Sequence, residues 1–256
     1  MTTGTPCPIH LYIVTGASRG LGASLVRALL KPGNRVIAVA RSRNTELEAE
    51  ATASGVPVAW HLQDLSQPGP SAGWLSSVLE AVDEAPASVT LILNAGVVEP
   101  IGPITELHEN SLVPHLQTNL VTPMTMTGAF IDATARFDCP RKVLAISSGA
   151  ARNPVPGWSA YCAGKAGLDM FIRSVNAEYA GLADDRAVRA VALAPGVVDT
   201  GMQETIRGAD FAQVQRFRDL KANDQLASPD DVAQRIAAYL ERADFGKTEL
   251  DDIRNY

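Results

Sequence analysis

The sequence predicts an α/β fold with a doubly wound parallel sheet and helices on both faces, in a single domain that spans residues 1–256. Three observations lead to this class. Short β-branched apolar runs alternate with helical patterns along the chain, a glycine-rich turn joins the first run to the first helical pattern, and no linker, internal repeat or low-complexity tract intervenes. Alternating strands and helices imply parallel strands joined by right-handed crossovers.

The composition is that of a globular protein with one core, since 46% of the residues are hydrophobic and 20% are charged. The formal net charge of −6 disfavours nucleic acid and anionic membranes as partners, so we expect a small-molecule ligand. The cysteines Cys7, Cys139 and Cys162 lack metal-ligand spacing, and we expect neither a disulfide framework nor a metal site. The sequence shows no signal-like start and no apolar stretch of about 18 residues, which predicts a cytoplasmic protein.

The first unit has the pattern of a strand over residues 11–14, a glycine-rich loop over residues 15–22 and a helix over residues 23–30. Gly16, Gly20 and Gly22 allow a tight turn and a close approach of the backbone to a pyrophosphate at the positive end of the helix. This is the arrangement of a Rossmann-type dinucleotide site, although an ordinary strand-to-helix turn is the alternative. The spacing Gly-x-x-x-Gly-x-Gly also differs from the commonest dinucleotide fingerprint.

The second strand, over residues 35–40, is followed by Arg41 at the place where an acidic residue would hold a ribose 2′-hydroxyl. Arg41, together with Arg19 from the glycine loop, suits the doubly charged 2′-phosphate of NADP. A solvated basic turn is the alternative for Arg41, and more so for Arg43. The sequence therefore predicts NADP as the cofactor.

A third strand, over residues 56–62, leads to Asp64, which either caps a helix or contacts the adenine amino group. Residues 68–70 are typical of a turn and residues 74–84 of an amphipathic helix. Residues 89–93 then form a buried strand that ends in Asn94-Ala95-Gly96, whose small side chains would let the backbone pack against the cofactor ribose.

A long helical pattern covers residues 110–136 and has Asn119 in its middle, where Asn is not favoured. Either a functional role or bonding to local backbone would explain this residue. A buried strand over residues 143–146 then delivers Ser147 and Ser148 at its carboxyl end, the edge at which open α/β sheets bind ligands.

The helical pattern of residues 157–182 contains Tyr161 and Lys165, which lie four residues apart and therefore on one face of the helix. An ammonium group beside a phenol lowers the phenol pKa from its ordinary value of about 10. Tyr161 is thus predicted to donate a proton at neutral pH. The pair alone is a weak signal, and it gains weight from Ser148 and the glycine loop.

Residues 188–193 form the next strand, and the Pro195-Gly196 pair in the segment over residues 194–200 ends it above the same sheet edge. Residues 201–226 lack strand character and are long for a connection, which predicts a partly helical lid over a ligand. Ser228 then caps the last helix, with Pro229 in its first turn.

With these motifs in view, the chain resembles the classical short-chain dehydrogenase/reductase family over essentially its whole length. The resemblance rests on the glycine loop, on residues 94–96 and 195–200, and on a catalytic tetrad in the order that the family shows. The tetrad residues are Asn119, Ser148, Tyr161 and Lys165. The residues predicted to bind the cofactor are Gly16, Ser18, Arg19, Gly20, Leu21, Gly22, Arg41, Asp64, Asn94, Ala95, Gly96, Tyr161, Lys165, Pro195, Gly196, Val198 and Thr200.

The resemblance implies a reaction in which NADPH gives a hydride to a carbonyl carbon. Tyr161 would protonate the developing alkoxide, and Ser148 would donate a hydrogen bond to the same oxygen. Lys165 would lower the pKa of Tyr161 and hold the nicotinamide ribose, while Asn119 would position a water that relays protons to Lys165. Backbone near Val198 would meet the nicotinamide carboxamide, and Thr200 would contact a phosphate.

A narrower resemblance connects the chain to the sepiapterin reductase and benzil reductase branch, through residues 194–202, 217–226 and 240–245. This resemblance implies a compact vicinal dicarbonyl or a pterin-like ketone as substrate, bound in an apolar pocket. The residues predicted to contact the substrate are Ser148, Trp158, Tyr161, Met202 and Asp252. The position of Asp252 follows from counting on from Phe245, and a solvated acidic pair with Asp251 is the alternative.

We therefore predict an NADPH-dependent carbonyl reductase. The alternatives are an NAD(P)-dependent alcohol or 3-oxoacyl dehydrogenase/reductase and a nucleotide-sensing binding protein on the same fold. The resemblance also implies a homodimer or homotetramer built on the outer faces of the helices over residues 110–136 and 157–182.

Overall fold

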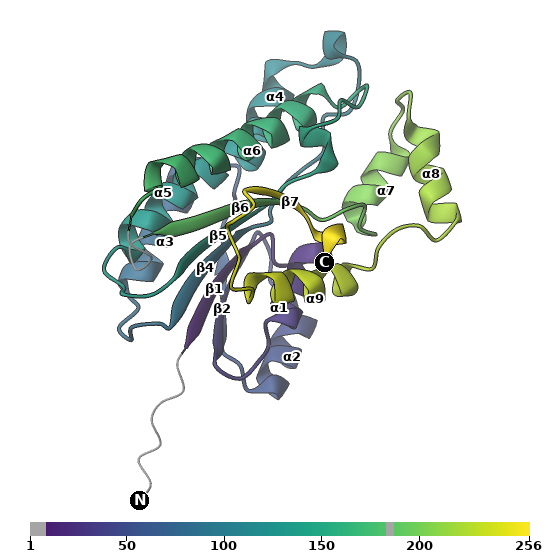
Figure 1. Ribbon diagram of the computed structural model, residues 1–256. Coiled ribbons are helices and arrows are strands. Elements are labelled where there is room, and N and C mark those ends of the chain that lie inside the picture. The colour runs from purple at the N-terminus through teal and green to yellow at the C-terminus, as the bar shows by residue number, and fades with distance from the viewer. Residues whose placement is uncertain (1–8, 183–186) are drawn as a thin grey trace, which may run out of the picture.

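The computed structural model describes residues 9–182 and 187–256, which contain one parallel sheet of seven strands in the order β3-β2-β1-β4-β5-β6-β7 (Figure 1). The strands are β1 (His10–Thr15), β2 (Asn34–Ala40), β3 (Val58–Leu62), β4 (Ser88–Leu93), β5 (Arg141–Ile146), β6 (Val188–Ala194) and β7 (Leu250–Asp252). The strand order reverses between β1 and β4, and ligands bind beyond the carboxyl ends of the strands at such a reversal. The predicted doubly wound fold is confirmed.

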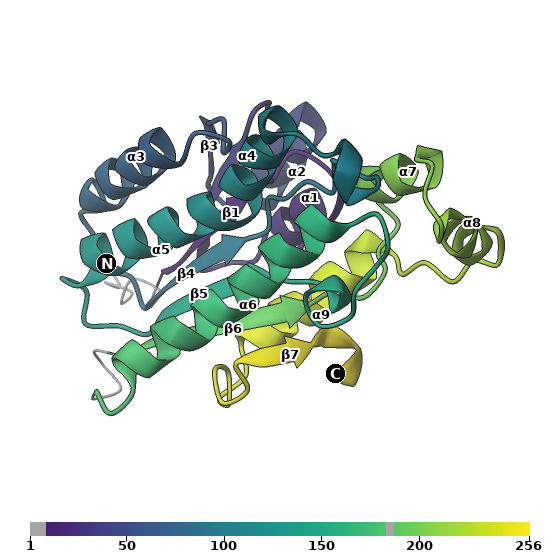
Figure 2. The ribbon, with the colours of Figure 1, turned by 90° about the horizontal axis from the view of Figure 1, so that it is seen from above.

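Helices cover both faces of the sheet (Figures 1 and 2). One face carries α1 (Gly20–Ala28), α2 (Thr45–Ser54) and α9 (Pro229–Leu240). The other carries α3 (Pro68–Glu80), α4 (Glu109–Leu116), α5 (Thr122–Thr134) and α6 (Ser159–Tyr179). Two further helices, α7 (Gly201–Gly208) and α8 (Val214–Ala222), lie beyond the carboxyl ends of the strands. Both belong to residues 201–226, the segment predicted to form a lid.

The strands are apolar on both sides because helices bury both faces of the sheet. In β1, Tyr12 and Val14 join the apolar cluster beneath α1 and α9, while Leu11 and Ile13 join the cluster beneath α3, α5 and α6. Ile13 pairs in register with Ile37 of β2 on one side and with a leucine of β4 on the other. This double-sided core fixes the strand ends that carry the candidate site.

Three elements differ from the prediction. Helix α3 begins at Pro68 instead of residue 74, so the predicted turn at residues 68–70 is wrong. Proline is tolerated in the first turn of a helix because a backbone N–H at that position has no intrahelical partner, and its absence costs nothing. Helix α2 was not predicted, although Asn44 caps its start and Gly55 ends it with a φ of 70°. Strand β7 has three residues, too few to show a period of two in the sequence.

The helical pattern over residues 110–136 is not one helix. A π-helical turn, Gln117–Val121, separates α4 from α5 and contains Asn119. Pro123 lies four residues after Asn119 and has no N–H to donate to the Asn119 carbonyl, so the regular α-helical ladder is interrupted at this point.

Residues 201–226 are largely helical, as predicted, and their use as a lid stays a prediction. Cys139 and Cys162 are free thiols, and Cys7 lies outside the described residues. Among the helices of the described segments, none has the length and apolar character needed to cross a membrane.

Candidate active site

A tight glycine turn carries the chain from β1 into α1. Gly16 and Gly20 have φ angles of 68° and 54°, which residues with side chains rarely adopt. At Gly22 an added Cβ would lie 2.0 Å from the carbonyl oxygen of Gly16, so a larger residue does not fit. Leu21 packs into the core, whereas Arg19 is exposed at the N-cap and provides no side-chain cap. The first N–H groups of α1 thus face the carboxyl edge of the sheet, where they can bind an anion.

The predicted motif at residues 94–96 lies directly against this turn. The Thr15 hydroxyl accepts hydrogen bonds from the backbone N–H groups of Asn94 (2.9 Å) and Ala95 (3.1 Å). The side-chain amide of Asn94 donates to the Thr15 carbonyl at 2.9 Å. A Cβ at Gly16 would lie 2.9 Å from the Ala95 Cα. Small residues are therefore required on both loops, and Asn94 holds the two loops together.

Asn119 is buried, and its amide group exchanges two hydrogen bonds with the backbone of Val97. Its Oδ1 accepts from the Val97 N–H at 3.0 Å, and its Nδ2 donates to the Val97 carbonyl at 2.7 Å. An added Cβ at Gly96 would lie 2.9 Å from Asn119 Oδ1 and 3.7 Å from Lys165 Nζ. Three predicted residues from three different elements therefore come together here.

The sequence prediction missed His115, which completes this cluster. Its ring is 1% exposed, and Nδ1 lies 2.6 Å from the Glu99 carbonyl, so Nδ1 carries the proton in this contact. Asn119 Nδ2 lies 2.9 Å from Nε2 of the same ring. Burial lowers the pKa of His115, which keeps the ring neutral at pH 7. Its position four residues before Asn119, on the same helix face, is the signal that could have found it.

Tyr161 and Ser148 meet at the carboxyl end of β5. Tyr161 is the third residue of α6, and Ser148 is the second residue after the end of β5. Burial raises the pKa of Tyr161 to about 12, and a hydrogen bond with the Ser148 side chain acts in the opposite direction. The phenol therefore keeps its proton at neutral pH.

Lys165 does not lower the pKa of Tyr161 in this structure, which corrects the sequence prediction. Its Nζ lies 5.8 Å from the Tyr161 ring centroid and donates a hydrogen bond to the Ile146 carbonyl at 2.7 Å. Burial lowers the pKa of Lys165 itself to about 8, and Asp169, one turn further along α6, opposes this shift. The prediction weighed the charge pair and left out desolvation, which dominates for both buried groups.

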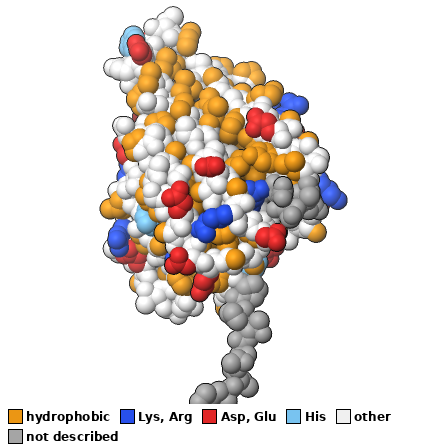
Figure 3. All heavy atoms as spheres, turned by 90° about the vertical axis from the view of Figure 1, so that its left-hand side faces the viewer, with side chains coloured by type: hydrophobic (Ala, Val, Ile, Leu, Met, Phe, Trp, Pro, Cys, Tyr) orange, Lys and Arg blue, Asp and Glu red, His pale blue; other side chains and the backbone are white. Residues whose placement is uncertain are grey.

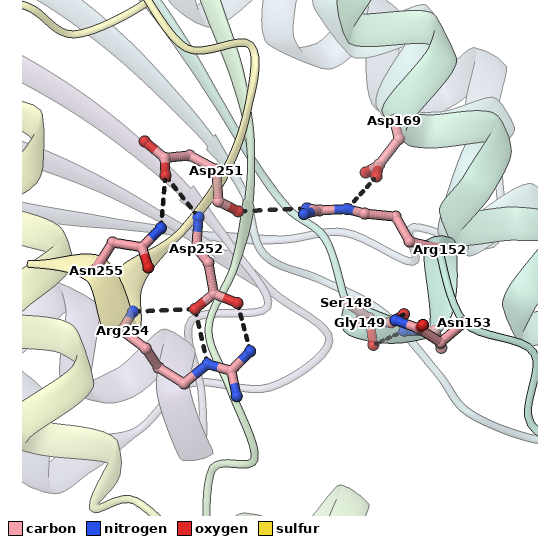
Figure 4. Close-up of polar contacts among 10 residues, drawn as sticks. Ser148, Gly149, Arg152, Asn153, Asp169, Asp251, Asp252, Arg254 and Asn255 are labelled. Atoms are coloured by element: carbon pink, nitrogen blue, oxygen red, sulfur yellow. Dashed lines mark hydrogen bonds and ion pairs between the residues drawn. The ribbon is translucent and has the colours of Figure 1, made fainter.

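A second polar network lies behind the serines (Figure 4). The Ser147 hydroxyl donates to Asp169, whose other carboxylate oxygen lies 3.5 Å from Arg152 Nε. Arg152 also donates to the backbone carbonyl of Asp251 at 3.4 Å. Arg152 thereby connects the turn after Ser148 with α6 and with β7. The sequence prediction missed Arg152 and Asp169, although Asp169 follows Lys165 by one helical turn.

The segment over residues 195–200 reaches back to the glycine turn. Gly196 has a φ of 77°, and a Cβ at Gly20 would lie 3.2 Å from the Thr200 side chain. Val198 forms an isolated parallel bridge with Ala227. Pro195 directly follows β6. The structure thus brings Thr200 against the glycine turn, while Pro195, Gly196 and Val198 lie between it and the end of β6.

An aromatic cluster joins α7 and α8 to the candidate site. Trp158 stacks on Phe217 with a centroid distance of 5.1 Å and meets the Tyr161 ring edge-on at 5.6 Å. Phe211 contacts Trp158 at 5.8 Å, and Met202 packs against the same cluster. Trp158 and Met202, both predicted to contact the substrate, therefore belong to the same apolar cluster as Tyr161.

Asp252 lies at the end of β7, opposite Ala194, and is already paired (Figure 4). Its two oxygens accept from Arg254 Nε at 2.8 Å and from Arg254 Nη2 at 2.6 Å. Asp251 is buried and accepts hydrogen bonds from Tyr239 and Tyr256, so the alternative of a solvated acidic pair is wrong.

Two exposed arginines lie at the other end of the site. Arg19 and Arg41 make no ion pair within the described residues, whereas Arg43 pairs with Glu48. A Cβ at Gly201 would lie 3.9 Å from the Arg19 guanidinium, so Arg19 extends toward the start of α7.

Asp64 does not cap α3, because Gln67 is its N-cap residue. The Asp64 carboxylate accepts from the N–H of Ser66 at 3.0 Å and from its hydroxyl at 2.8 Å. The contact with adenine stays a prediction.

The arrangement fits a dinucleotide. Gly16, Gly22 and Gly96 let the loops along the carboxyl edge pack closely against their neighbours, since an added Cβ at each would clash with protein atoms, and the start of α1 carries no side-chain cap among the described residues. Arginines lie at one end of this edge, and the tyrosine, serine and lysine lie at the other.

Comparisons with known proteins agree with this geometry. A family model described as "short chain dehydrogenase" matches residues 10–210. The chain is 36% identical over 246 residues to benzil reductase ((S)-benzoin forming) of Bacillus cereus, a match that covers 94% of this chain and 98% of that protein. It is 32% identical over 252 residues to sepiapterin reductase of Meriones unguiculatus, covering 91% and 92% of the two chains. The crystal structure of the KRED1-Pglu enzyme superposes with a TM-score of 0.79 at 30% identity, covering 93% of this chain and 99% of that one.

Proposed function

Because the chain belongs to the short-chain dehydrogenase family, we propose that it is an NADPH-dependent carbonyl reductase acting on a small dicarbonyl or pterin-like ketone, with Tyr161 as proton donor. The observation that carries this proposal is the position of the buried Tyr161 phenol, which hydrogen-bonds with the Ser148 side chain beyond the carboxyl end of β5. Both hydroxyl groups lie beyond the carboxyl end of β5, where a carbonyl oxygen can accept from each. The nicotinamide cofactor of this family supplies the hydride.

The chain's own residues prepare the proton transfer. A phenol with a pKa of about 12 holds its proton until negative charge develops on the substrate oxygen. The Ser148 hydroxyl stabilises that same charge. Lys165, fixed by the Ile146 carbonyl, places a positive charge beside the phenol, and Asn119 is held in place by Val97. These contacts keep the reacting groups in a fixed geometry, which lowers the entropic part of the barrier.

The preference for NADPH rests on Arg19 and Arg41, which are exposed and carry no ion pair within residues 9–182 and 187–256. Guanidinium groups bind a 2′-phosphate through charge-assisted hydrogen bonds. We expect wild-type protein to bind NADPH more tightly than NADH, and Arg41→Asp to reverse this order. Equal affinities in the wild type, or an unchanged ratio in Arg41→Asp, would contradict the assignment.

The apolar surroundings of Tyr161 favour a dicarbonyl over a pterin. Trp158, Phe217 and Met202 form an apolar cluster with Tyr161, which suits a diketone with apolar substituents. The indole N–H of Trp158 is buried without a hydrogen-bond partner among the described residues, and we infer that it would donate to a second substrate oxygen only after α7 and α8 move away from it. Asp252, by contrast, already pairs with Arg254, and a pterin would have to displace that guanidinium. The relative named benzil reductase and the relative named sepiapterin reductase represent these two substrate classes.

The test is NADPH oxidation with a panel of vicinal diketones, pterin ketones, 3-oxoacyl esters and simple alcohols, in the wild type and in Tyr161→Phe. We expect diketone reduction by the wild type. Tyr161→Phe should lose activity by at least about a hundredfold, as expected for a lost general acid, while its NADPH affinity stays within about twofold. Faster oxidation of an alcohol with NAD than reduction of a diketone with NADPH would contradict the proposal, and so would substantial turnover by Tyr161→Phe. NADPH binding without turnover of any substrate would favour a nucleotide sensor.

A further inference from the structure

The side chain of Asn44 connects the two loops that carry the unpaired arginines. Its Nδ2 donates a hydrogen bond to the backbone carbonyl of Ser18, in the glycine turn, at 3.0 Å. Its Oδ1 accepts from the N–H of Leu47 at 3.0 Å and so caps the start of α2. The Asn44 amide nitrogen therefore donates to the glycine turn, while the amide oxygen caps α2.

The loop over residues 41–44 has few other attachments. Arg41, Ser42 and Arg43 are exposed, and Arg43 turns back to pair with Glu48 of α2 at 3.0 Å. Before the loop, the Ala40 carbonyl accepts from the N–H of residue 63. The hydrogen bond from Asn44 is thus the contact that joins this loop to the glycine turn among the described residues.

The glycine turn itself does not depend on Asn44. The N–H of Ala17 donates to the Val39 carbonyl at 3.1 Å, and Asn94 holds both Thr15 and Gly16 through its side-chain amide. Loss of the Asn44 contact should therefore loosen the loop that carries Arg41 and leave the pyrophosphate end of the site intact.

We propose that Asn44 is a positioning residue for 2′-phosphate recognition, because it sets the place of Arg41 relative to the glycine turn that carries Arg19. This inference rests on the proposed use of NADPH. A phosphate held by guanidinium groups from two loops needs those loops at a fixed separation, and an untethered loop must be ordered at each binding event. NADH has no 2′-phosphate and does not use this geometry.

The tether can be separated from the helix cap by mutation. Asn44→Ser keeps a side-chain oxygen that can cap α2 and removes the donor to Ser18, since Ser is among the preferred N-cap residues. Asn44→Ala removes both functions. Arg43→Gln is the matched control, because it changes the same loop and its ion pair with Glu48 but leaves the tether in place.

The experiment measures the dissociation constants of NADPH and NADH for the whole protein by calorimetry, together with the melting temperature. We expect Asn44→Ser to weaken NADPH by about five- to tenfold, the worth of roughly one net hydrogen bond, with NADH within about twofold of wild type and a melting temperature only a few degrees lower. Asn44→Ala should show the same loss of NADPH affinity and a larger drop in melting temperature. Arg43→Gln should keep the ratio of the two affinities.

Three results would overturn the inference. If the Asn44→Ser variant retains the full NADPH preference of the wild type, Asn44 has no role in recognition of the 2′-phosphate. Equal losses for NADPH and NADH assign it a general structural role. A wild type that binds both cofactors equally overturns the proposed cofactor, and with it this inference, whereas the first two results leave the proposed function standing.

Discussion

At the scale of single residues, burial decides the charge states of the candidate site. Tyr161 and Lys165 are 6% and 4% exposed, and removal from water favours the neutral form of each. The pKa of the phenol rises and that of the ammonium falls, opposite to the effect of a simple ion pair. The sequence shows that these residues lie four apart on a helix, but it does not show their exposure to water, which determines the direction of both pKa shifts.

The lowered pKa of Lys165 predicts a basic limit to activity. Lys165 is charged below a pH of about 8 and loses its charge above it, while Tyr161 keeps its proton to about 12. We therefore expect kcat/KM for NADPH-driven reduction to fall as pH rises through about 8, because the charge beside the phenol is lost. The measurement is a pH profile from about 6 to about 10 at saturating NADPH. A flat profile across this range would exclude Lys165 as the controlling group.

At the scale of elements, the turn between β1 and α1 requires glycine at position 22. A Cβ there would lie 2.0 Å from the Gly16 carbonyl and 2.6 Å from Asn94 Nδ2, so Gly22→Ala must displace the turn or the loop at residues 94–96. We expect this variant to lose at least about 2 kcal/mol of unfolding free energy and most of its affinity for the cofactor.

Gly73→Ala is the matched control for Gly22→Ala. Gly73 is exposed in the middle of α3, and an added Cβ would contact nothing within 4 Å. The variant should gain about 0.5 to 1 kcal/mol, because alanine loses less backbone entropy on folding than glycine. Urea denaturation and cofactor titration of both variants test this, and equal effects of the two substitutions would show that the close contacts at Gly22 do not matter.

The apolar runs were enough to predict the six strands β1 to β6 and the parallel topology, because each of these strands is a mostly apolar segment of five to seven residues. They were not enough for β7, whose three residues are held by pairing with β6. The π-helical turn follows from a missing N–H at Pro123 and leaves the apolar pattern almost unchanged. The early start of α3 was missed because prolines signal a turn and a first helical turn alike.

The contacts of the candidate site were less predictable than its residues. The family resemblance predicted Asn119, Ser148, Tyr161 and Lys165 as site residues, but the positions of His115 and Arg152 depend on partners distant in the sequence. The contact of Asp252 with a substrate stays a prediction, and its pairing with Arg254 was not foreseen. Such pairings depend on side-chain rotamers and on loop packing, which spacing does not determine.

At the scale of the whole molecule, apolar side chains remain exposed on the helices expected to form an interface. Val113 lies on α4, Val121 ends the π-helical turn and Met124 lies on α5, while Met170 lies on α6; 38 to 55% of the surface of each is exposed. Figure 3 shows hydrophobic side chains gathered in a band on the face that carries α3, α5 and α6. Exposed apolar clusters of this kind are typical of protein interfaces.

We expect a homodimer or homotetramer through this surface. Light scattering at micromolar concentration should give a mass of at least two chains, and Met124→Glu combined with Met170→Glu should give the mass of one, because each carboxylate would be buried without a partner. Leu62→Glu, at an exposed apolar residue on the edge strand β3, should leave the mass unchanged. A single-chain mass for the wild type would reject this prediction.

The aromatic stack between Trp158 of the candidate site and Phe217 of α8 has a consequence for the predicted lid. If α7 and α8 lift, Phe211 and Phe217, now 9% and 6% exposed, lose their burial, and the rings of Trp158 and Phe217, which stack at 5.1 Å, separate. Burial of such rings is worth about 1.5 to 3 kcal/mol each, so we expect an open form to be a minor population of the free protein. Any ligand that enters only through the open form has its apparent affinity reduced by that fraction. The rings packed around Trp158 would then set the share of molecules that can receive a substrate.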